Sequence, residues 1–211
     1  MSKGKLLIIN FIGLVVVLGL IATGVYMYYQ NKNYVKTDDA VVSADITEVV
    51  APASGILTEW KGSAGNDMKV NQAVGTVNDG KAAHEIDSIA AGTIIKNEVK
   101  ANELVQSGQV LAQTADMDHM YVLANIKETE LNDIEIGDNV DITVDGDSNV
   151  TFDGKVEDIS YATNSVFSAL PSQNATGNYT KVTQKVQVKI SIQNPTKKVL
   201  LGMNAEVKIS I

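Results

Sequence analysis

The chain of 211 residues contains no cysteine, no arginine, only two histidines and only 5% aromatic residues. Without cysteine there can be no disulfide bond, no thiol nucleophile and no zinc–thiolate site. The two histidines, His84 and His119, lie far apart in the sequence and have no cysteine or paired carboxylates at ligand spacing, so neither is expected to bind a metal. We therefore expect no metal and no cofactor.

Acidic residues dominate the chain from Asp38 onwards. Two of the 17 lysines precede a long apolar run near the N-terminus, so 15 lysines face all 25 acids in the remainder, a net charge of −10. Nucleic acid binding requires a clustered basic surface, so we exclude it. Asp38 and Asp39 are adjacent in a predicted strand, where neighbouring side chains point to opposite faces and cannot converge. Because no nucleophile set or phosphate-binding glycine loop is present either, the protein is predicted not to be an enzyme.

The segment Leu6–Tyr29 contains no charged residue. As a helix it would be about 36 Å long, enough to cross a hydrocarbon core of about 30 Å. Lys3 and Lys5 precede it, which predicts a cytoplasmic N-terminus and an extracytoplasmic C-terminal part. A cleaved signal peptide is the alternative, but this run is long and ends in bulky tyrosines where a cleavage site would need small residues. We interpret residues 1–30 as a cytoplasmic tip and a single-pass membrane anchor.

Two related segments follow, Ala51–Val77 and Ser88–Thr114. Each contains a small-residue turn, a β-rich run, a polar turn and a Val-x-x-small hairpin, which aligns Ala73 with Gly108. Hairpin corners need positive φ angles, which glycine adopts without steric cost, and we assign this role to the following glycines: Gly55, Gly92 and Gly108. Neither segment can bury its apolar face alone, so the two are expected to pair into a small two-sheet sandwich.

The remaining sequence predicts five or six short antiparallel strands that close into a small β-barrel. The fold class is therefore mainly β: a transmembrane helix, a sandwich and a barrel. The expected domain boundaries are residues 1–30 for the anchor, 31–47 for a membrane-proximal linker and first strand, 48–115 for the sandwich with a short connector at 78–87, and 116–211 for the barrel.

The paired segments resemble the lipoyl/biotinyl fold, the barrel-sandwich hybrid. The connector between them reads NDGKAAHEIDSIAAG and places Lys81 where lipoyl carrier domains have their modified lysine. A lipoyl carrier is therefore one hypothesis. Gly80 stands where that family has an aspartate, and the predicted topology puts Lys81 on the wrong side of the membrane for cytoplasmic ligases.

The order of motifs along the chain resembles the HlyD-type membrane fusion proteins, or periplasmic adaptor proteins, in their EmrA-like branch. The resemblance is carried by these segments: Tyr34–Leu57 with its Thr-Asp-Asp-Ala motif, Met120–Gly146, Asn174–Asn178, and Gly202–Ile209. It implies a non-enzymatic subunit of a multidrug efflux system that assembles on the outer face of a transporter of the major facilitator class.

Two features depart from that family. Its members insert a long α-helical hairpin between the lipoyl halves, but residues 77–88 leave room here for only a short connection. A single-membrane, Gram-positive-type envelope fits this omission. In addition, Lys185 stands where the family has arginine, which weakens any bidentate contact made there.

The polar stretch that begins at Phe167 contains no catalytic residue type, and a loop of this length is commonly functional. We predict that it contacts either a neighbouring adaptor subunit or the transporter; packing on its own barrel is the alternative. The predicted contact residues are Phe167, Leu170, Asn174, Thr176, Gly177, Asn178, Lys181 and Lys185. The expected partners are thus a polytopic membrane transporter, a second copy of the chain and the cytoplasmic membrane. A cell-wall-binding or structural ectodomain is the alternative function, although the acidic surface lacks aromatic platforms for glycans.

Overall fold

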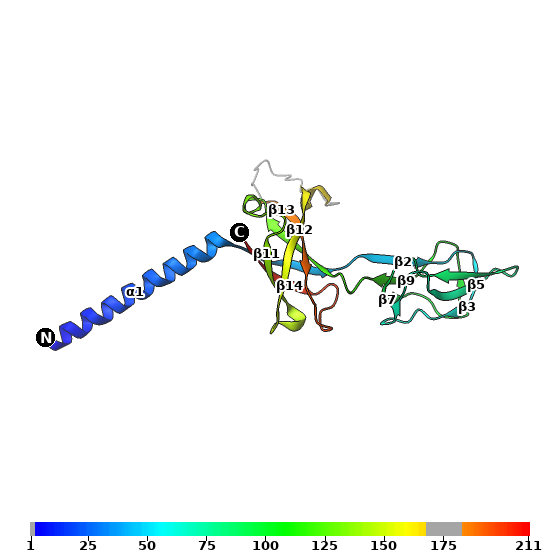
Figure 1. The fold of residues 1–211 in the computed structure, drawn as a ribbon, viewed down its shortest axis with the longest axis horizontal. Helices are drawn as coiled ribbons and strands as arrows, with labels where there is room; N and C mark the ends of the chain where they lie inside the picture. Colours follow the sequence, from blue (N-terminus) through cyan, green and yellow to red (C-terminus); the bar gives the residue numbers. More distant parts are fainter. Residues whose placement is uncertain (1–2, 168–182) are drawn as a thin grey trace, which may run out of the picture. The chain divides into compact units, whose positions relative to one another are not determined.

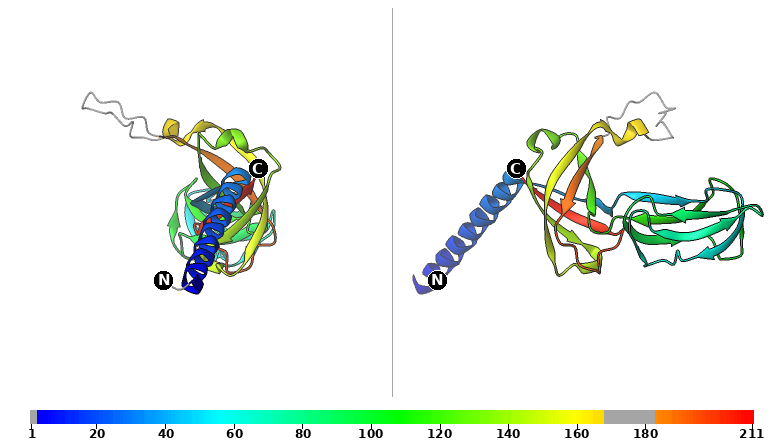
Figure 2. Two further views of the ribbon diagram at one scale, coloured as in Figure 1. Left: turned by 90° about the vertical axis from the view of Figure 1, so that its left-hand side faces the viewer. Right: turned by 45° about the vertical axis from the view of Figure 1, so that its right-hand side comes forward.

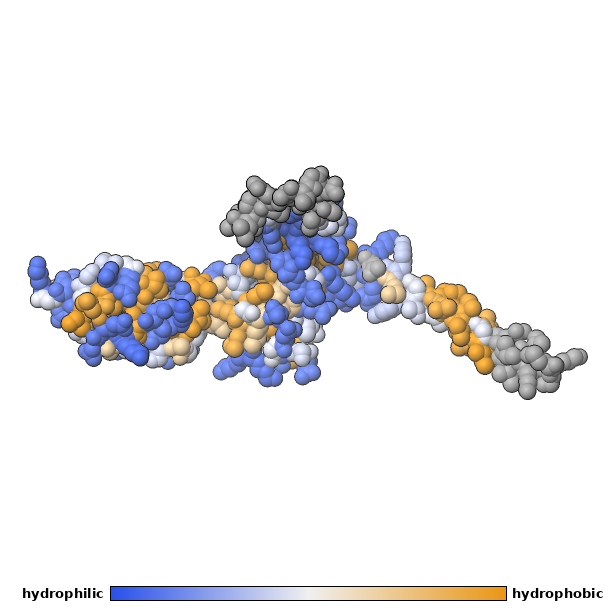
Figure 3. Space-filling view, turned by 180° about the vertical axis from the view of Figure 1, so that it is seen from behind, coloured by the Kyte–Doolittle hydropathy of each residue, from blue (hydrophilic) through white to orange (hydrophobic). Residues whose placement is uncertain are grey.

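The computed structural model describes residues 3–167 and 183–211. Helix α1 (Lys3–Asn33) includes the whole apolar segment (Figure 1). Its residues Phe11–Gln30 are long and apolar enough to cross a membrane, and none of this stretch is buried against the rest of the protein. The apolar side chains of the helix do not form one stripe, which is typical of a helix that faces lipid on all sides. The face seen in Figure 3 is apolar along the described part of the span.

The described residues form two compact units. The sandwich unit comprises Val41–Leu123 and Ser191–Met203, and the barrel unit comprises the described residues of Met1–Ala40, Ala124–Ile190 and Asn204–Ile211. The sandwich strands are β2 (Ile46–Val50), β3 (Gly55–Trp60), β4 (Asp67–Met68), β5 (Ala73–Asn78), β6 (Ala83–Asp87), β7 (Gly92–Asn97), β8 (Leu104–Val105) and β9 (Val110–Ala115). They form two antiparallel sheets of four strands, in the orders β2-β9-β7-β4 and β6-β5-β3-β8.

The sandwich is a strict internal repeat. Strands β6, β7, β8 and β9 have the same lengths as β2, β3, β4 and β5, and each begins 37 residues after its counterpart, as Gly92 follows Gly55. Exchanging each strand for its counterpart converts one sheet order into the other, so the two halves are related by a pseudo-twofold axis. Loop hydrogen bonds repeat as well: Ala51 N–H donates to the Gln109 carbonyl, and Ser88 N–H donates to the Gln72 carbonyl, both at 2.9 Å.

This offset corrects the alignment of the hairpin turns. Gly108 has a φ of +80°, and the residue 37 positions earlier is Asn71, with a φ of +58°. Asparagine is the residue that best replaces glycine in this conformation, because its short polar side chain tolerates it. The alignment of Ala73 with Gly108 is therefore wrong, since Ala73 begins strand β5.

At Gly55 the reason for glycine also differs from the expected positive φ, which the structure does not show there. A Cβ atom on Gly55 would lie 2.2 Å from the carbonyl oxygen of Asn78 on the neighbouring strand. Its counterpart Gly92 has the same constraint, because a Cβ there would lie 2.6 Å from the carbonyl oxygen of Ala115. Both glycines thus permit close approach of two backbones.

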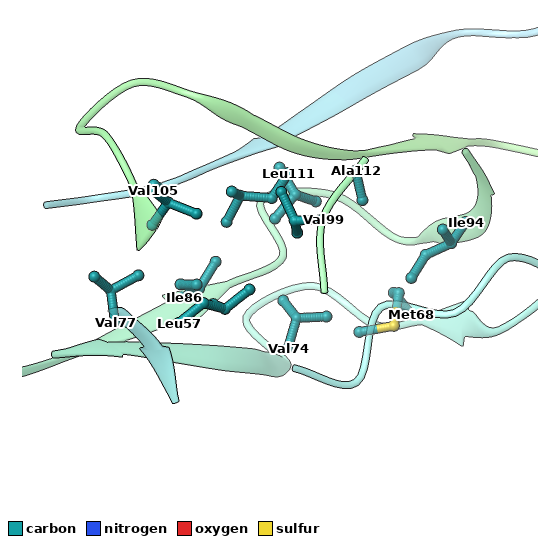
Figure 4. Close-up of a cluster of buried hydrophobic side chains, with 12 residues drawn as sticks. Leu57, Met68, Val74, Val77, Ile86, Ile94, Val99, Val105, Leu111 and Ala112 are labelled. Carbon is teal, nitrogen blue, oxygen red and sulfur yellow. The ribbon is translucent and has the colours of Figure 1, made fainter. Parts of the chain in front are cut away.

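The sandwich core lies between the two sheets, and counterpart residues from the two halves make up most of it (Figure 4). Leu57 and Ile94 occupy equivalent positions and are fully buried. Trp60 packs at the edge of this core, and its indole N–H donates to Asn97, which is its own counterpart, at 3.0 Å. A contact between counterparts places this hydrogen bond near the pseudo-twofold axis.

Residues 78–87, expected to be a connector, are mostly strand. β6 pairs with β5 from Asn78↔Ala83 onwards, so only residues 79–82 form the turn. The Asp79 carboxylate caps this turn by accepting hydrogen bonds from the N–H groups of Lys81 and Ala82, both at 2.7 Å. Two strands joined by a four-residue turn stand at the position where the resemblance described above implies a helical hairpin.

Six strands of the described residues close into a barrel in the order β1-β10-β13-β12-β11-β14. They are β1 (Tyr34–Ser43), β10 (Tyr121–Lys127), β11 (Asn139–Val144), β12 (Thr151–Thr163), β13 (Lys185–Ile192) and β14 (Asn204–Ser210). Three short 3-10 helices, η1 (Leu131–Asp133), η2 (Asp145–Asp147) and η3 (Asn164–Phe167), connect them. Buried and exposed residues alternate along β11, β13 and β14, as expected for strands with one face in a core.

The first barrel strand comes from residues that precede the sandwich in the sequence, so the sandwich is inserted between β1 and β10. Helix α1 ends at Asn33 and β1 begins at Tyr34 with no intervening linker. The N–H of Ile211 donates to the carbonyl of Asn33 at 3.0 Å, which fixes the last strand beside the end of the helix (Figure 2).

Candidate functional site

The predicted contact residues fall mainly in the stretch 168–182. Phe167 is the last residue of η3 and Lys185 is the first residue of β13. The other predicted contact residues lie outside the described part of the chain: Leu170, Asn174, Thr176, Gly177, Asn178 and Lys181. Their contact role stays a prediction, and the structural description of the site rests on the residues that flank this stretch.

Lys185 forms an ion pair with Asp39, the second aspartate of the Thr-Asp-Asp-Ala motif. The Lys185 Nζ atom lies 2.7 Å from Asp39 Oδ2. The two residues are 146 positions apart in the sequence. This contact joins the motif in β1, which carries part of the family resemblance, to the lysine at the start of β13, which departs from it.

An asparagine completes the arrangement around the carboxylate. Asn125 on β10 donates its side-chain N–H to Asp39 Oδ1 at 2.9 Å, and its side-chain oxygen accepts a hydrogen bond from Asn164 of η3 at 2.7 Å. Thr37 donates its hydroxyl to the Asn125 carbonyl at 3.2 Å and accepts the backbone N–H of Asp39 at 3.1 Å. We call these five residues (Thr37, Asp39, Asn125, Asn164 and Lys185) the Asp39 network.

The Asp39 network shows how a lysine is accommodated at the position where the family resemblance leads us to expect an arginine. Lysine is a point charge that satisfies one carboxylate oxygen, whereas a guanidinium binds both oxygens in a fork. Here Lys185 binds Oδ2 and Asn125 binds Oδ1, so both oxygens of Asp39 have a donor. An arginine at position 185 would compete with Asn125 for the second oxygen.

The electrostatics agree with this geometry. Hydrogen bonds from Lys185 and Asn125 lower the pKa of Asp39, and the Asp39 carboxylate raises the pKa of Lys185. The side chains are 41% and 44% exposed, so solvent screens the pair and it stabilises the barrel only modestly. The network has a stronger effect on position. Asn164 binds Asn125 on β10 and Lys185 binds Asp39 on β1, and Asn125 and Asp39 bind each other, so the residues on both sides of the stretch 168–182 are held by one connected group.

The adjacent aspartate, Asp38, lies beside this network. It is exposed and lines a shallow depression together with Lys36, Glu206 and the network residue Thr37, and its charge adds to that of Asp39 in raising the pKa of Lys185. The two neighbouring carboxylates thus have different surroundings, and only Asp39 has direct hydrogen-bond donors from β10 and β13.

Both histidines are paired with an aspartate. His84 Nε2 lies 3.1 Å from Asp79 Oδ2, and His119 Nδ1 lies 2.8 Å from Asp116 Oδ2. Asp116 raises the pKa of His119 through this hydrogen bond. Within the part of the chain that the structure describes, no three His, Cys, Asp or Glu side chains gather closely enough to hold a metal ion. Lys81 lies exposed on the turn after β5.

A pair of exposed apolar residues marks one end of the sandwich, and sequence reasoning missed it. Ile56 and Leu104 are cross-strand neighbours on β3 and β8 and are 50% and 74% exposed. Their counterparts in the other half are Thr93 and Asp67, whose side chains form a hydrogen bond of 2.6 Å. The fold therefore accepts a polar pair at this position, and only the 37-residue offset could have identified the difference.

Comparison with known proteins assigns both β-units. Residues 45–116 match the family model described as YhbJ, barrel-sandwich hybrid domain, and residues 119–210 match the AAEA-like beta-barrel domain. A solved structure of the periplasmic adaptor protein EmrA has the same fold, with a TM-score of 0.56 and 12% identity over 84% of this chain and 98% of that one.

Two relatives are more similar in sequence, and the second of them shows the family. The multidrug resistance protein EmrK of Escherichia coli (strain K12) is 42% identical over 109 residues, which are 51% of this chain but only 28% of EmrK. YhbJ of Bacillus subtilis (strain 168), which is named as an efflux system component, is 55% identical over 210 residues, covering 100% of this chain and 95% of YhbJ. The chain therefore belongs to the HlyD-type membrane fusion proteins, in the EmrA-like branch that includes YhbJ, and it lacks the α-helical hairpin of the longer members.

Proposed function

We propose that this chain is the membrane-anchored adaptor subunit of a multidrug efflux system and that its transporter belongs to the major facilitator class. The observation that carries the proposal is the direct passage from α1 into the barrel: the helix ends at Asn33 and β1 begins at Tyr34. An adaptor built in this way holds its barrel at the membrane surface, where it can reach the outer loops of a polytopic protein. Lys3 and Lys5 favour a cytoplasmic N-terminus, which puts both β-units outside.

The relatives support the efflux role. YhbJ is named for an efflux system, and EmrK and EmrA are named for multidrug resistance and export. The major facilitator class follows from the EmrA-like branch, which serves such transporters. The chain would supply no energy itself, because the transporter would use the proton gradient.

The proposed transporter contact is the stretch from Phe167 to Lys185. Lys185 begins β13 and Asn164 begins η3, and the Asp39 network links both to strands β1 and β10. This arrangement supports a contact stretch whose two ends leave the barrel from fixed positions.

We propose that a second copy of the chain binds at the Ile56–Leu104 pair. The pair lies at the end of the sandwich opposite to residues 45–46 and 115–116, through which the chain enters and leaves this unit. Since Thr93 and Asp67 fill the equivalent positions with a hydrogen-bonded pair, the exposed apolar area is not a requirement of the fold.

Co-purification tests the transporter contact. The tagged full-length protein, expressed at its native level and extracted in mild detergent, should bring down a polytopic transporter in stoichiometric amount. A chain whose residues 1–30 are replaced by an unrelated spanning helix controls for incidental capture of membrane proteins. Loss of the wild-type gene should also raise sensitivity to the substrates of that transporter. Purification of the chain alone, together with unchanged sensitivity, would refute the efflux role.

Self-association is tested separately by replacing the apolar pair with its polar counterparts, Ile56→Thr and Leu104→Asp. The double variant should dissociate at concentrations where the wild type is oligomeric, as measured by light scattering of the full chain in detergent. Val70→Ser is the matched control, since it also exchanges an exposed apolar residue for its counterpart, Ser107, outside the pair. Equal dissociation of the control, or none in the double variant, would place the contact elsewhere.

A further inference from the structure

A cavity of about 400 Å³ lies at the membrane end of the barrel unit. The end of α1 contributes Gln30, and β1 contributes Tyr34, Val35 and Lys36. Glu130 and Asp133, at η1, line it from the loop after β10. None of these residues belongs to the Asp39 network, and the proposed adaptor role does not use them.

The cavity opens at the depth of lipid headgroups. The apolar span of α1 covers Phe11–Gln30, so the first cavity residue is also the last residue of the span. Tyr26, Tyr28 and Tyr29 are exposed immediately before it. Exposed tyrosines at the end of a spanning helix gather at the membrane–water interface, where phospholipid headgroups lie.

The lining carries one cation and two carboxylates. Glu130 is already paired with Lys127, at 3.3 Å. Within the described residues, by contrast, neither Lys36 nor Asp133 forms an ion pair. A ligand with one anionic and one cationic group would satisfy both.

An unsatisfied acceptor points to the cationic part of such a ligand. Gln30 donates its side-chain N–H to the Tyr26 hydroxyl at 3.1 Å, whereas its Oε1 atom is buried and has no hydrogen-bond partner. A buried acceptor without a donor costs free energy, so a donor from outside the chain stabilises the site. An ammonium group offers three N–H donors and complements the negative charge of Asp133.

We propose that this cavity binds the headgroup of a zwitterionic phospholipid of the phosphatidylethanolamine type. Lys36 contacts the phosphate, and the ammonium group lies among Asp133, Glu130 and Gln30. The proposal rests on the membrane anchoring of the chain but not on the identity of the transporter. A lipid held there fixes the barrel base at a defined height on the membrane.

Native mass spectrometry of the full chain in detergent tests the proposal. The added lipids share the same acyl chains and carry phosphoethanolamine, phosphoglycerol or no phosphate as headgroup. Phosphatidylethanolamine should bind at least about threefold more tightly than phosphatidylglycerol, and diacylglycerol more weakly than both. Water-soluble glycerophosphoethanolamine, added in excess, should compete only weakly, because the acyl chains contribute to binding in the lipid but not in the free headgroup.

Two variants separate the contacts with the two charges. Lys36→Gln should weaken binding of both phospholipids about equally, since it removes the phosphate contact. Asp133→Asn should remove the preference for phosphatidylethanolamine without weakening phosphatidylglycerol. Lys32→Gln is the control, because Lys32 lies in the last turn of α1 but does not line the cavity. Equal binding of all three lipids, or an equal effect of the control and Lys36→Gln, would overturn the proposal.

Discussion

The Asp39–Lys185 ion pair predicts a measurable coupling between β1 and β13. Asp39→Asn keeps the shape and the acceptor for Asn125 but removes the charge, and Lys185→Gln removes the other charge. Because both side chains are more than one-third exposed, solvent screens their charges, so Asp39→Asn should destabilise the barrel by about 1 kcal/mol at most. Lys185→Gln should lower the Tm of the wild type but have little further effect in the Asp39→Asn variant, because its partner charge is already gone. For a chain of this size, 1 kcal/mol corresponds to a decrease in Tm of about 2–4 °C.

The assay is thermal unfolding of the full-length protein in detergent, for the wild type, both single variants and the double variant. The control pair is Lys189–Glu157, which involves the same strand but is longer, at 3.6 Å. Its coupling should be smaller, because Asp39 is held by Asn125 as well as by lysine. A coupling at Asp39–Lys185 that is no larger than the control would refute the argument that the network fixes the carboxylate.

The same pair predicts a pH dependence with a defined sign. The folded-state pKa of Asp39 is lower than its ordinary value of 3.8, because Lys185 and Asn125 donate hydrogen bonds to the carboxylate. The stabilisation is therefore fully present above pH 3.8 and is lost as the pH falls through the lower folded-state pKa. The difference in Tm between the wild type and Asp39→Asn should shrink in that acidic range and stay constant between about pH 5 and 7.

Two further predictions concern the sandwich. In thermal unfolding, Gly55→Ala should destabilise it by about 2–3 kcal/mol, since the new Cβ would lie 2.2 Å from the Asn78 carbonyl oxygen. Gly80→Ala should destabilise it by only about 1 kcal/mol, because Gly80 has a φ of +86° but open space around it. Equal losses would show that the close approach is not what requires Gly55. In an NMR titration the Asp79 carboxyl should have a pKa of about 2, because the N–H of Ala82 and then that of Lys81 donate to it; a midpoint near 3.8 would mean that the turn is not capped in this way.

Much of the fold could be predicted from local sequence patterns. The anchor follows from the length and lack of charge of Leu6–Tyr29, and β13 follows from its alternation of apolar and polar residues. The sandwich repeat could be detected from similar residue types in the two segments, but its alignment could not. Matching by residue type paired Ala73 with Gly108, while the structure pairs residues by backbone conformation and puts Asn71 opposite Gly108.

The candidate site depended on information that a single strand pattern does not contain. Asp39 and Lys185 contact each other because the barrel order places their strands, β1 and β13, on the two sides of β10. This strand order cannot be predicted from the alternation of residues within a strand. Thr37 and Asp39 could be noted as a motif, and Lys185 as a departure from the family. Their common partner Asn125 gives no sequence signal, since an asparagine in a strand has no typical role.

The symmetry of the sandwich explains how this chain can omit a large element of its relatives without loss of the fold. Residues 79–82 lie 37 positions after residues 42–45, where the chain passes from β1 into β2. The pseudo-twofold axis exchanges the two ends of the sandwich, so the turn lies at the end opposite to the one where the chain enters and leaves. An insertion there leaves both sheets intact, because the turn residues are all exposed and contribute nothing to the core. Since Asp79 closes the turn with two hydrogen bonds, the short form is a complete structure of its own. In the proposed adaptor role, a short turn in place of a long insertion favours a partner at the same membrane over one at a distant membrane.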